Sequence, residues 1–283
     1  MRDSRPYRDR KTPSRKGQSW PLVSIVTPSF NQGQFLEKTI LSVRTQDYPF
    51  IEHIIVDGGS SDETLNILRK YQRDVKWISE PDEGQSDAIN KGFRMSKGDI
   101  LAYLNSDDIY LTGAIRRVVD VFRRTRATDM IYGGYFIIDE DENVLRKCKL
   151  FDISFADLLR RNVIGQPSVF FRRRILEKVG PLDVKLRYAM DFDLWLRIAS
   201  MGTIKHMNEY LSCFRIHPKS KTVKERLKFS KEAYFQVITK HVSDKRSLYF
   251  PYVVSVIRLV FRNLLSLVVG DARLERFLGV LRS

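Results

Sequence analysis

The feature that most constrains the fold is a regular alternation of short apolar segments with longer amphipathic ones between residues 22 and 135. The apolar segments are rich in valine and isoleucine, as buried strands are, and the longer segments repeat apolar residues at helical spacing. Strands are predicted at 22–27, 51–56, 75–78, 100–104 and 130–135, and helices at 35–44, 61–71, 86–95 and 112–126. Because strands that alternate with helices form right-handed βαβ units, the pattern predicts an α/β fold with a mostly parallel sheet.

The pattern changes after residue 138. The polar run 139–143 is typical of a turn that closes a hairpin, and a strand at 168–171 and a helix at 191–201 follow it. Further helices are predicted at 224–241 and from 248 onward. With 283 residues and 43% hydrophobic content, the chain is long enough for one large domain with an appendage or for two small ones. Its two cysteines, Cys148 and Cys213, are too few for a disulfide framework and are interpreted as buried apolar residues.

The formal net charge of +15 is concentrated at the two ends of the chain. Residues 1–19 carry seven basic and two acidic side chains, residues 219–283 carry fourteen and five, and the middle is nearly neutral. Basic ends of this kind suit anionic lipid or nucleic acid, and the polar first end is predicted to be disordered. The first twenty residues lack the apolar core of a signal peptide, so we expect a cytoplasmic location.

Polar residues follow the strand predicted at 100–104. The cluster Asn105-Ser106-Asp107-Asp108 comes directly after it. In open parallel sheets, ligands bind beyond the carboxyl ends of the strands. Carboxylate and amide oxygens at such a place suit Mg²⁺ or Mn²⁺, metals that commonly accompany phosphate groups. The cluster therefore points to chemistry on a nucleotide or a phosphate.

The first two predicted strands also end in polar clusters. The first ends in Thr27-Pro-Ser-Phe-Asn31, and the second ends at Asp57, which we expect to face the same crevice as Asp107. The Asp57 carboxylate can accept the N3–H of a uracil ring, and the Gly-Gly pair after it allows close backbone approach. Asp62 is interpreted as a helix cap. No Gly-x-Gly-x-x-Gly fingerprint follows the first strand, which argues against a dinucleotide-binding oxidoreductase.

A third polar cluster spans residues 80–92 and contains a helix N-terminus at Ser86 or Asp87. Asn90 and Lys91 lie on the first turns of that helix, where a polar side chain could face a bound nucleotide. A solvated helix with a capped end is the alternative interpretation of this cluster.

Four motifs occur in the order seen in glycosyltransferase family 2: Thr27-Pro-Ser-Phe-Asn31, Val56-Asp-Gly-Gly-Ser-Ser-Asp62, Asp87-Ala-Ile-Asn-Lys-Gly92 and Leu104-Asn-Ser-Asp-Asp108. The chain resembles this inverting family over roughly residues 21–218. The resemblance implies the GT-A fold, a Rossmann-like, mostly parallel sheet flanked by helices, with a C-terminal helical extension. It divides the chain into a disordered basic tail at 1–19, a catalytic domain at 20–218 and a basic amphipathic helical extension at 219–283.

The resemblance implies roles for the strand-end residues. Asp57 matches the aspartate that reads the nucleotide base. The sequence Asn105-Ser-Asp107 matches the Asp-x-Asp metal motif with asparagine in first place, so Asp107 is expected to hold the metal and Asn105 to contact ribose or water. Asp108 either supports this site or caps a helix. The implied nucleotide-binding residues are Thr27, Pro28, Phe30, Asp57, Asp87, Asn90, Lys91, Asn105 and Ser106.

A later segment, 188–197, resembles the Glu-Asp motif that supplies the catalytic base of the family. Here Met190 replaces the glutamate and Asp191 keeps the aspartate, so Asp191 is the implied base, with helix capping as the alternative. Asp193 either caps the helix or contacts the acceptor, and Trp195 is grouped with the acceptor side of the site.

Two further segments complete the implied site. The segment 162–167 resembles the flexible glycine-containing loop near the donor sugar, which places Gly165 and Gln166 there. The segment 214–221 resembles the one whose histidine completes the metal site, which assigns His217 to the metal. A structural histidine is the alternative.

The resemblance implies an inverting, single-displacement transfer of a sugar from a nucleotide-diphosphate sugar, in the first place a UDP-sugar, to a hydroxyl of a glycan or lipid-linked acceptor. Mn²⁺ or Mg²⁺ would be the cofactor. A nucleotidyltransferase acting on sugar phosphates is an alternative, but residues 28–31 lack its usual glycine-rich basic loop. A basic binding protein without activity is another, as is an inactive relative, given Asn105 and Met190. We expect no nucleic-acid partner, because no helix-turn-helix, zinc or aromatic RNA-binding motif is present.

The apolar segment 248–269 is interrupted by Arg258 and Arg262. A central arginine costs roughly 2.5–3.5 kcal/mol on membrane-insertion scales, which argues against a spanning helix. An interfacial helix on an anionic membrane, at the inner face, fits this pattern. A helix packed on the domain or in a homo-oligomer interface is the alternative.

Overall fold

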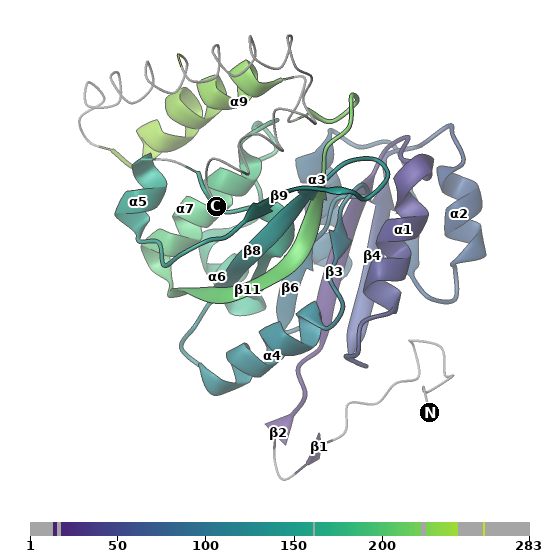
Figure 1. Cartoon of the computed structure of the whole chain (residues 1–283), viewed down its shortest axis with the longest axis horizontal. Coiled ribbons are helices and arrows are strands. Elements are labelled where there is room, and N and C mark those ends of the chain that lie inside the picture. Colours follow the sequence, from purple (N-terminus) through teal and green to yellow (C-terminus); the bar gives the residue numbers. More distant parts are fainter. Residues whose placement is uncertain (1–13, 16–17, 161, 222–224, 243–256, 258–283) are drawn as a thin grey trace.

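A computed structural model describes residues 14–15, 18–160, 162–221, 225–242 and 257 (Figure 1). Within these residues the protein has a nine-stranded mixed sheet with helices on both faces and a separate two-stranded ribbon, β1 (Ser14–Arg15) with β2 (Gln18–Ser19). The strands of the sheet are β3 (Val23–Ser29), β4 (Ile51–Asp57), β5 (Lys76–Ser79), β6 (Ile100–Tyr103), β7 (Ile109–Tyr110), β8 (Met130–Ile138), β9 (Val144–Cys148), β10 (Val169–Arg172) and β11 (Ile204–Arg215). The α-helices are α1 (Gly33–Arg44), α2 (Thr64–Lys70), α3 (Gln85–Met95), α4 (Ala114–Arg124), α5 (Phe155–Arg160), α6 (Arg173–Val179), α7 (Met190–Met201) and α9 (Arg226–Glu232).

The first half of the sheet has the predicted parallel arrangement. β5, β4, β3 and β6 lie in that order and run in the same direction, with Val23 opposite both Ile51 and Ile100. Because α1, α2 and α3 connect these strands in turn, the carboxyl ends of all four meet at one edge of the sheet. The predicted α/β fold is therefore confirmed, although the helix predicted at 61–71 begins at Thr64.

The second half of the sheet is mixed. β10 pairs antiparallel with β6 and β8, β9 forms with β8 the hairpin expected at 139–143, and β11 runs parallel to β8. The sequence pattern does not predict β11, because register shifts between Met207 and Ser212 interrupt its alternation. It also misses α5 and α6, which are too short for a helical repeat. Cys213 is buried as predicted, whereas Cys148 is half-buried.

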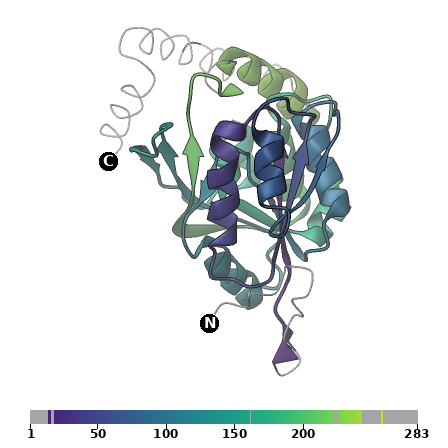
Figure 2. The ribbon, with the colours of Figure 1, turned by 90° about the vertical axis from the view of Figure 1, so that its right-hand side faces the viewer.

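Side chains alternate along β3 between two helical layers. Val23 and Ile25 pack with α4 and the end of α1, whereas Val26 packs with α3 and α7. Figure 2 shows α1 and α2 side by side on one face, where Leu68 of α2 shares a buried cluster with Ile55 of β4. The helical layers leave the carboxyl edge of the parallel strands to loops, and these loops carry the predicted site residues.

The described part of the predicted extension packs against this core. α9 continues into a π-helical turn, η3 (Ala233–Val237), and a 3₁₀ turn, η4 (Ile238–Lys240). Tyr234 and Val237 belong to the same buried cluster as Trp195 of α7. Residues 225–242 are thus continuous with the hydrophobic core (Figure 1).

Two sequence predictions fall outside the described residues. The first is the disorder of the tail at 1–19, of which the structure describes only the paired strands at 14–15 and 18–19. The second is the interfacial helix at 248–269, of which it describes only Ile257. Within the part of the chain that is described, no helix has the length and apolar character to cross a bilayer.

Candidate functional site

The carboxyl ends of β4, β3 and β6 bring the first polar clusters together. Asp57, the last residue of β4, lies opposite Ser29, the last residue of β3. On the other side of β3, the Leu104 amide donates to the Val26 carbonyl at 2.8 Å, immediately before the Asn105 cluster. Asp57 and Asp107 therefore lie at the same edge of the sheet, as the sequence predicts.

Asp57 is buried and organises the loop that follows β4. Its Oδ2 accepts from the Ser60 amide at 2.9 Å, the Gly59 amide at 3.2 Å and the Ser79 hydroxyl at 2.6 Å. Its Oδ1 accepts from the Ser60 hydroxyl. Because each carboxylate oxygen has two lone pairs, Oδ1 keeps the capacity to accept a further hydrogen bond.

The loop after β4 is also held against the neighbouring segments. A Cβ at position 58 would lie 2.6 Å from Oδ2 of Asp82, so a larger residue there would displace the Asp82 carboxylate. Asp62 accepts from the amides of Gly33 at 2.9 Å and Thr64 at 3.0 Å, the first residues of α1 and α2. These contacts agree with the capping interpretation of Asp62.

The residues that end β3 divide into two groups. Phe30 is 60% exposed and stands at the edge of the sheet. Thr27 and Pro28 are buried inside β3, and Oγ1 of Thr27 lies 2.9 Å from Nε2 of His53. Burial lowers the pKa of His53 to about 3, which keeps this ring neutral. We therefore correct the prediction for Thr27 and Pro28, since their side chains are buried within β3 and are not exposed at its end.

The residues predicted on α3 also need a correction. Asn90 is buried and exchanges hydrogen bonds with the amide and carbonyl of Leu182 at 3.0 and 2.9 Å. Its side chain thus joins α3 to the segment before α7, and we assign it that role in place of a nucleotide contact. The Lys91 ammonium lies 2.9 Å from the Glu80 carboxylate and 3.4 Å from that of Asp87. The two predicted residues Lys91 and Asp87 are thus ion-paired with each other.

The loop after β6 contains a carboxylate–imidazole pair. Oδ2 of Asp107 lies 3.0 Å from Nε2 of His217, although the two residues are 110 positions apart. The Asp107 side chain is 20% exposed, while His217 is buried and its ring lies 4.7 Å from that of Phe35. The predicted pairing of Asp107 with His217 at one place is therefore present in the structure.

Asp108, beside this pair, is fully buried. Its Oδ1 accepts from the Arg215 amide at 2.9 Å, and its Oδ2 accepts from the Asn105 amide group at 3.3 Å. Burial, and next the charge of Asp107, raise the pKa of Asp108 well above its usual range. Asp108 thus fixes the loop from inside and does not cap a helix.

Asp107 and His217 are suitable ligands for a metal ion that a substrate diphosphate also binds. Among the described residues, no three His, Cys, Asp or Glu side chains gather as a group that could hold a metal. Asp107 and His217 would supply two ligands. Mg²⁺ and Mn²⁺ take carboxylates together with water and substrate phosphates, so two protein ligands fit a metal that arrives with a diphosphate.

A chain of amide groups connects the Asp107 loop to its neighbours. The Gln85 amide donates to Oδ1 of Asn105 at 2.7 Å, and Asn105 donates to Oε1 of Gln166 at 3.2 Å. The Lys221 ammonium donates to Gln85 at 3.1 Å. The sequence reasoning did not single out Gln85 and Lys221, although both belong to this hydrogen-bonded chain and fall within segments it considered.

Gly165 and Gln166 lie where the donor-sugar loop is predicted. Gln166 is buried and donates to the Tyr103 carbonyl at 2.7 Å, at the end of β6. A Cβ at position 165 would lie 2.2 Å from the Tyr135 ring, so the turn into the 3₁₀ helix η2 (Gln166–Ser168) requires glycine. The segment is therefore fixed directly against the Asp107 loop.

The first turn of α7 holds Asp191. Its side chain is partly buried, and Oδ1 accepts from the Phe192 amide at 2.7 Å. Burial raises the pKa of Asp191 to about 6 against the hydrogen bonds from the amides of Phe192 and Asp191, which lower it, and the charge of Glu232 adds a smaller increase. On the same turn, Sδ of Met190 lies 2.8 Å from the Ser86 hydroxyl, so the start of α7 contacts the start of α3.

Two residues predicted on the acceptor side have structural contacts instead. Asp193 is 2% exposed and is paired with Arg197 at 2.8 Å and Lys240 at 3.3 Å. Trp195 is completely buried and its ring stacks on that of Tyr103. Both predictions are corrected, because Asp193 is held by its ion pairs and Trp195 is packed inside the core, although Trp195 lies one helical turn from Asp191.

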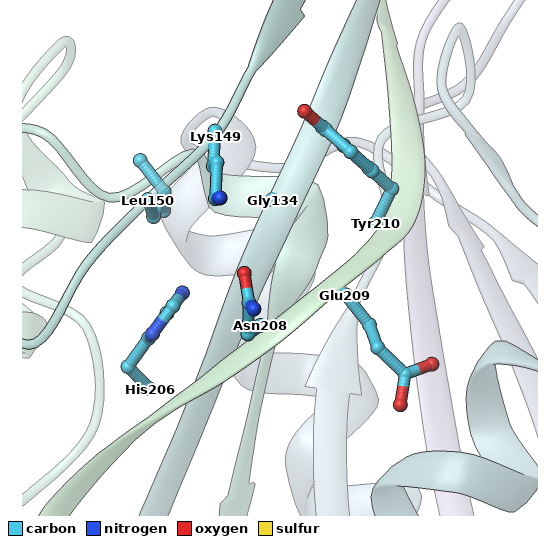
Figure 3. A pocket seen from close by; sticks show the side chains of 7 residues that line it. All are labelled: Gly134, Lys149, Leu150, His206, Asn208, Glu209 and Tyr210. Carbon is cyan, nitrogen blue, oxygen red and sulfur yellow. The ribbon is translucent and has the colours of Figure 1, made fainter.

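A small pocket lies elsewhere on the sheet (Figure 3). It is formed where β8, β11 and the residues after β9 meet, beside the register shift between Met207 and Tyr210. The residues that line it are Gly134, Lys149, Leu150, His206, Asn208, Glu209 and Tyr210. None of the predicted site residues is among them, so this pocket is separate from the candidate site.

Comparison with known proteins identifies the family of this chain. A family model described as Glycosyl transferase family 2 matches residues 24–180, more than half of the chain. An uncharacterized glycosyltransferase of Rickettsia prowazekii is 31% identical over 210 residues, which cover 70% of this chain and 64% of that relative. The chain belongs to glycosyltransferase family 2.

Two solved structures share the fold with this family 2 chain. The 1–349 fragment of TarS from S. aureus, in complex with UDP-GlcNAc, aligns with a TM-score of 0.60 at 14% identity and covers 75% of this chain and 64% of that one. The mannosyltransferase PcManGT from Pyrobaculum calidifontis, in complex with GDP-Man and Mn²⁺, aligns with a TM-score of 0.58 at 13% identity and covers 98% and 91%. The GT-A fold implied by the sequence motifs is thereby confirmed.

The family match covers part of the candidate site. Residues 24–180 contain Asp57 and Asp107, whereas Asp191 and His217 lie beyond the matched segment. The roles proposed for Asp191 and His217 therefore rest on their contacts in the structure and on the motifs around them.

Proposed function

We propose that this family 2 protein transfers a sugar, with inversion, from a UDP-sugar to a hydroxyl of a glycan or lipid-linked acceptor. The observation that carries the proposal is the Asp107–His217 pair at the carboxyl edge of the sheet. Asp191 lies near this edge, because burial, and then the charges of Asp191 and Asp108, raise the pKa of Tyr103 at the end of β6. Two proteins of the same fold were solved with nucleotide sugars, TarS with UDP-GlcNAc and PcManGT with GDP-Man.

The nucleoside of the donor would lie over the ends of β3 and β4. Phe30 exposes an aromatic face there, and Oδ1 of Asp57 has a lone pair for the N3–H of a uracil ring. Asn105 and Ser106 follow at the end of β6, beside the ribose in this arrangement. Lys91, paired with Asp87, places a cation at the rim.

The diphosphate would lie beside the loop after β6. Asp107 and His217 would hold Mn²⁺ or Mg²⁺, which, when bound, neutralises the charge that develops on the leaving diphosphate. PcManGT was solved with Mn²⁺, which supports this choice of metal. The Lys221 ammonium, held beside Gln85, adds a second positive charge on the same side.

Asp191 would act as the general base. As the acceptor oxygen forms its bond to the anomeric carbon, its proton passes to the Asp191 carboxylate. The bond from the anomeric carbon to the β-phosphate oxygen breaks at the same time, and the electron pair leaves with the diphosphate. Because attack is direct, the configuration at carbon inverts and no protein nucleophile is required. General-base assistance of this kind contributes roughly 10²–10⁴-fold to a rate.

A thermal-shift panel of UDP-, GDP- and dTDP-sugars with Mn²⁺ tests the proposal. A selective ligand raises the melting temperature by mass action, so one group of nucleotide sugars should stabilise the wild type when Mn²⁺ is present. Asp107→Ala should lose this Mn²⁺-dependent shift. Asp120→Ala on α4, which removes a half-exposed carboxylate outside the site, should keep it. An equal shift in Asp107→Ala would remove Asp107 from the metal site.

A further inference from the structure

Glu232, the last residue of α9, contacts the backbone that precedes α7. Its carboxylate accepts hydrogen bonds from three consecutive backbone amides, those of Arg187 at 3.2 Å, Tyr188 at 2.7 Å and Ala189 at 2.7 Å. Glu232 is 7% exposed, and Ala189 is completely buried. A buried amide needs a hydrogen-bond partner, so these contacts fix the backbone two to four residues before Asp191.

A second contact ties the same segment to α7. Lys240 on η4 lies 3.3 Å from the buried Asp193, which is also paired with Arg197. Tyr234 and Val237, between Glu232 and Lys240, pack into the cluster that contains Trp195. The first turn of α7 is therefore held by α9 and η4, outside the parallel half of the fold.

We propose that Glu232 is a positioning residue for Asp191, which it serves by fixing the backbone immediately before α7. This inference rests on the proposed function, because it gives Asp191 the role of base. A base must be held at hydrogen-bond distance from the acceptor hydroxyl, and a displacement of about 1 Å costs on the order of 10²-fold in rate.

The negative charge of Glu232 also affects the pKa of Asp191. Asp191 faces Tyr103 from β6 and Glu232 from α9, and Lys221 and Arg187 lie beside Glu232. A nearby negative charge disfavours ionisation of a carboxyl group, so Glu232 adds to the effect of burial in keeping the pKa of Asp191 high. A residue that merely stabilised the fold would leave the Asp191 titration unchanged.

The test is a titration of Asp191 that needs no substrate. In protein labelled with ¹³C at the aspartate carboxyl groups, the Asp191 resonance is assigned by its loss in Asp191→Asn. Its midpoint in the wild type is expected near pH 6. Glu232→Gln, which removes the charge and keeps one acceptor oxygen, should shift that midpoint downward. Glu225→Gln, which removes a charge from the same segment, should leave it in place. An unshifted midpoint in folded Glu232→Gln would overturn the proposal.

Amide exchange provides a second test that does not depend on the glutamine variant folding. Glu232→Asp keeps the charge but withdraws the carboxylate by one methylene, so the amides of Tyr188 and Ala189 should exchange faster than in the wild type. Unchanged exchange at both amides would contradict the positioning role. Failure of the proposed function is seen separately, as undiminished turnover in Asp191→Asn, whereas these measurements concern Glu232 whatever the donor.

Discussion

The Asp191 carboxylate destabilises the folded chain at neutral pH. Burial raises its pKa to about 6, whereas an aspartate in an unfolded chain titrates near 3.9. Between about pH 3.9 and pH 6 the folded state binds more protons than the unfolded state. The free energy of unfolding therefore falls as the pH rises through this range, and the loss is complete above about pH 6. A site that needs a base near neutral pH thus keeps a carboxylate in surroundings that disfavour its charge.

Asp191→Asn should therefore stabilise the protein in a pH-dependent way. The variant removes the buried charge, and the expected gain in free energy of unfolding above pH 6 is at most about 3 kcal/mol, because one pKa unit corresponds to about 1.4 kcal/mol. Below about pH 4 both proteins are neutral at this position, and the gain should vanish. Denaturant unfolding at pH 4 and pH 7.5 measures the difference. A gain that is equal at both pH values would contradict the assigned pKa.

Arg215 joins the loop after β6 to the β8–β9 hairpin. It is 1% exposed, and its guanidinium donates to the carbonyls of Asp107 at 2.8 Å and of Asp139 and Glu140 at 3.1 Å. A single side chain thus satisfies backbone groups from two loops that are far apart in sequence. Elements that the sequence pattern treats as separate are in this way fixed to one another at the site.

Arg215→Met should loosen this junction and lower stability. Each hydrogen bond that is lost contributes about 0.5–1.5 kcal/mol net, so the loss of all three should lower the free energy of unfolding by at least about 1.5 kcal/mol. Mn²⁺-dependent nucleotide binding should weaken as well, since Asp107 is on the released loop. Lys219→Met, which changes an exposed basic residue of the same segment, serves as the control. Unchanged unfolding and binding in Arg215→Met would contradict this account.

At the level of elements, the sequence predicts the parallel strands well because each is a short apolar run between polar clusters. β11 escapes prediction since its exposed polar residues and register shifts hide the alternation. The polar clusters locate Asp57, Asp107 and Asp191 correctly at strand ends and a helix start. Pattern alone cannot distinguish Asn90 and Asp193 from site residues, because their partners, Leu182 and Lys240, are contributed by distant segments.

In the whole molecule, the core of the sheet and the C-terminal segment each supply part of the site. The family match ends at residue 180, yet α7, His217 and Glu232 follow it. No spacing rule in the sequence connects Glu232 to residues 187–189, since the contact depends on how α9 packs. The described residues 225–242 are part of the folded core, while the basic apolar segment after them remains a sequence-based prediction of membrane contact.

Removal of residues 243–283 tests that prediction of membrane contact. The shortened chain should sediment less with anionic liposomes than the full chain, because the arginines at 258 and 262 are expected to meet lipid headgroups. Its melting temperature should be unchanged, since residues 225–242 remain. Neutral liposomes are the control. Equal sedimentation of the two proteins would favour packing or self-association for this segment.

In the proposed function, Asp191 acts as base on a nucleotide sugar bound at the edge of the sheet. The most direct measurement compares wild type and Asp191→Asn for turnover of the nucleotide sugar that the thermal-shift panel selects, together with calorimetric binding of its nucleotide with Mn²⁺. We predict unchanged nucleotide binding and a loss of turnover of about 10²–10⁴-fold in the variant. Turnover at the wild-type rate in Asp191→Asn would contradict the account.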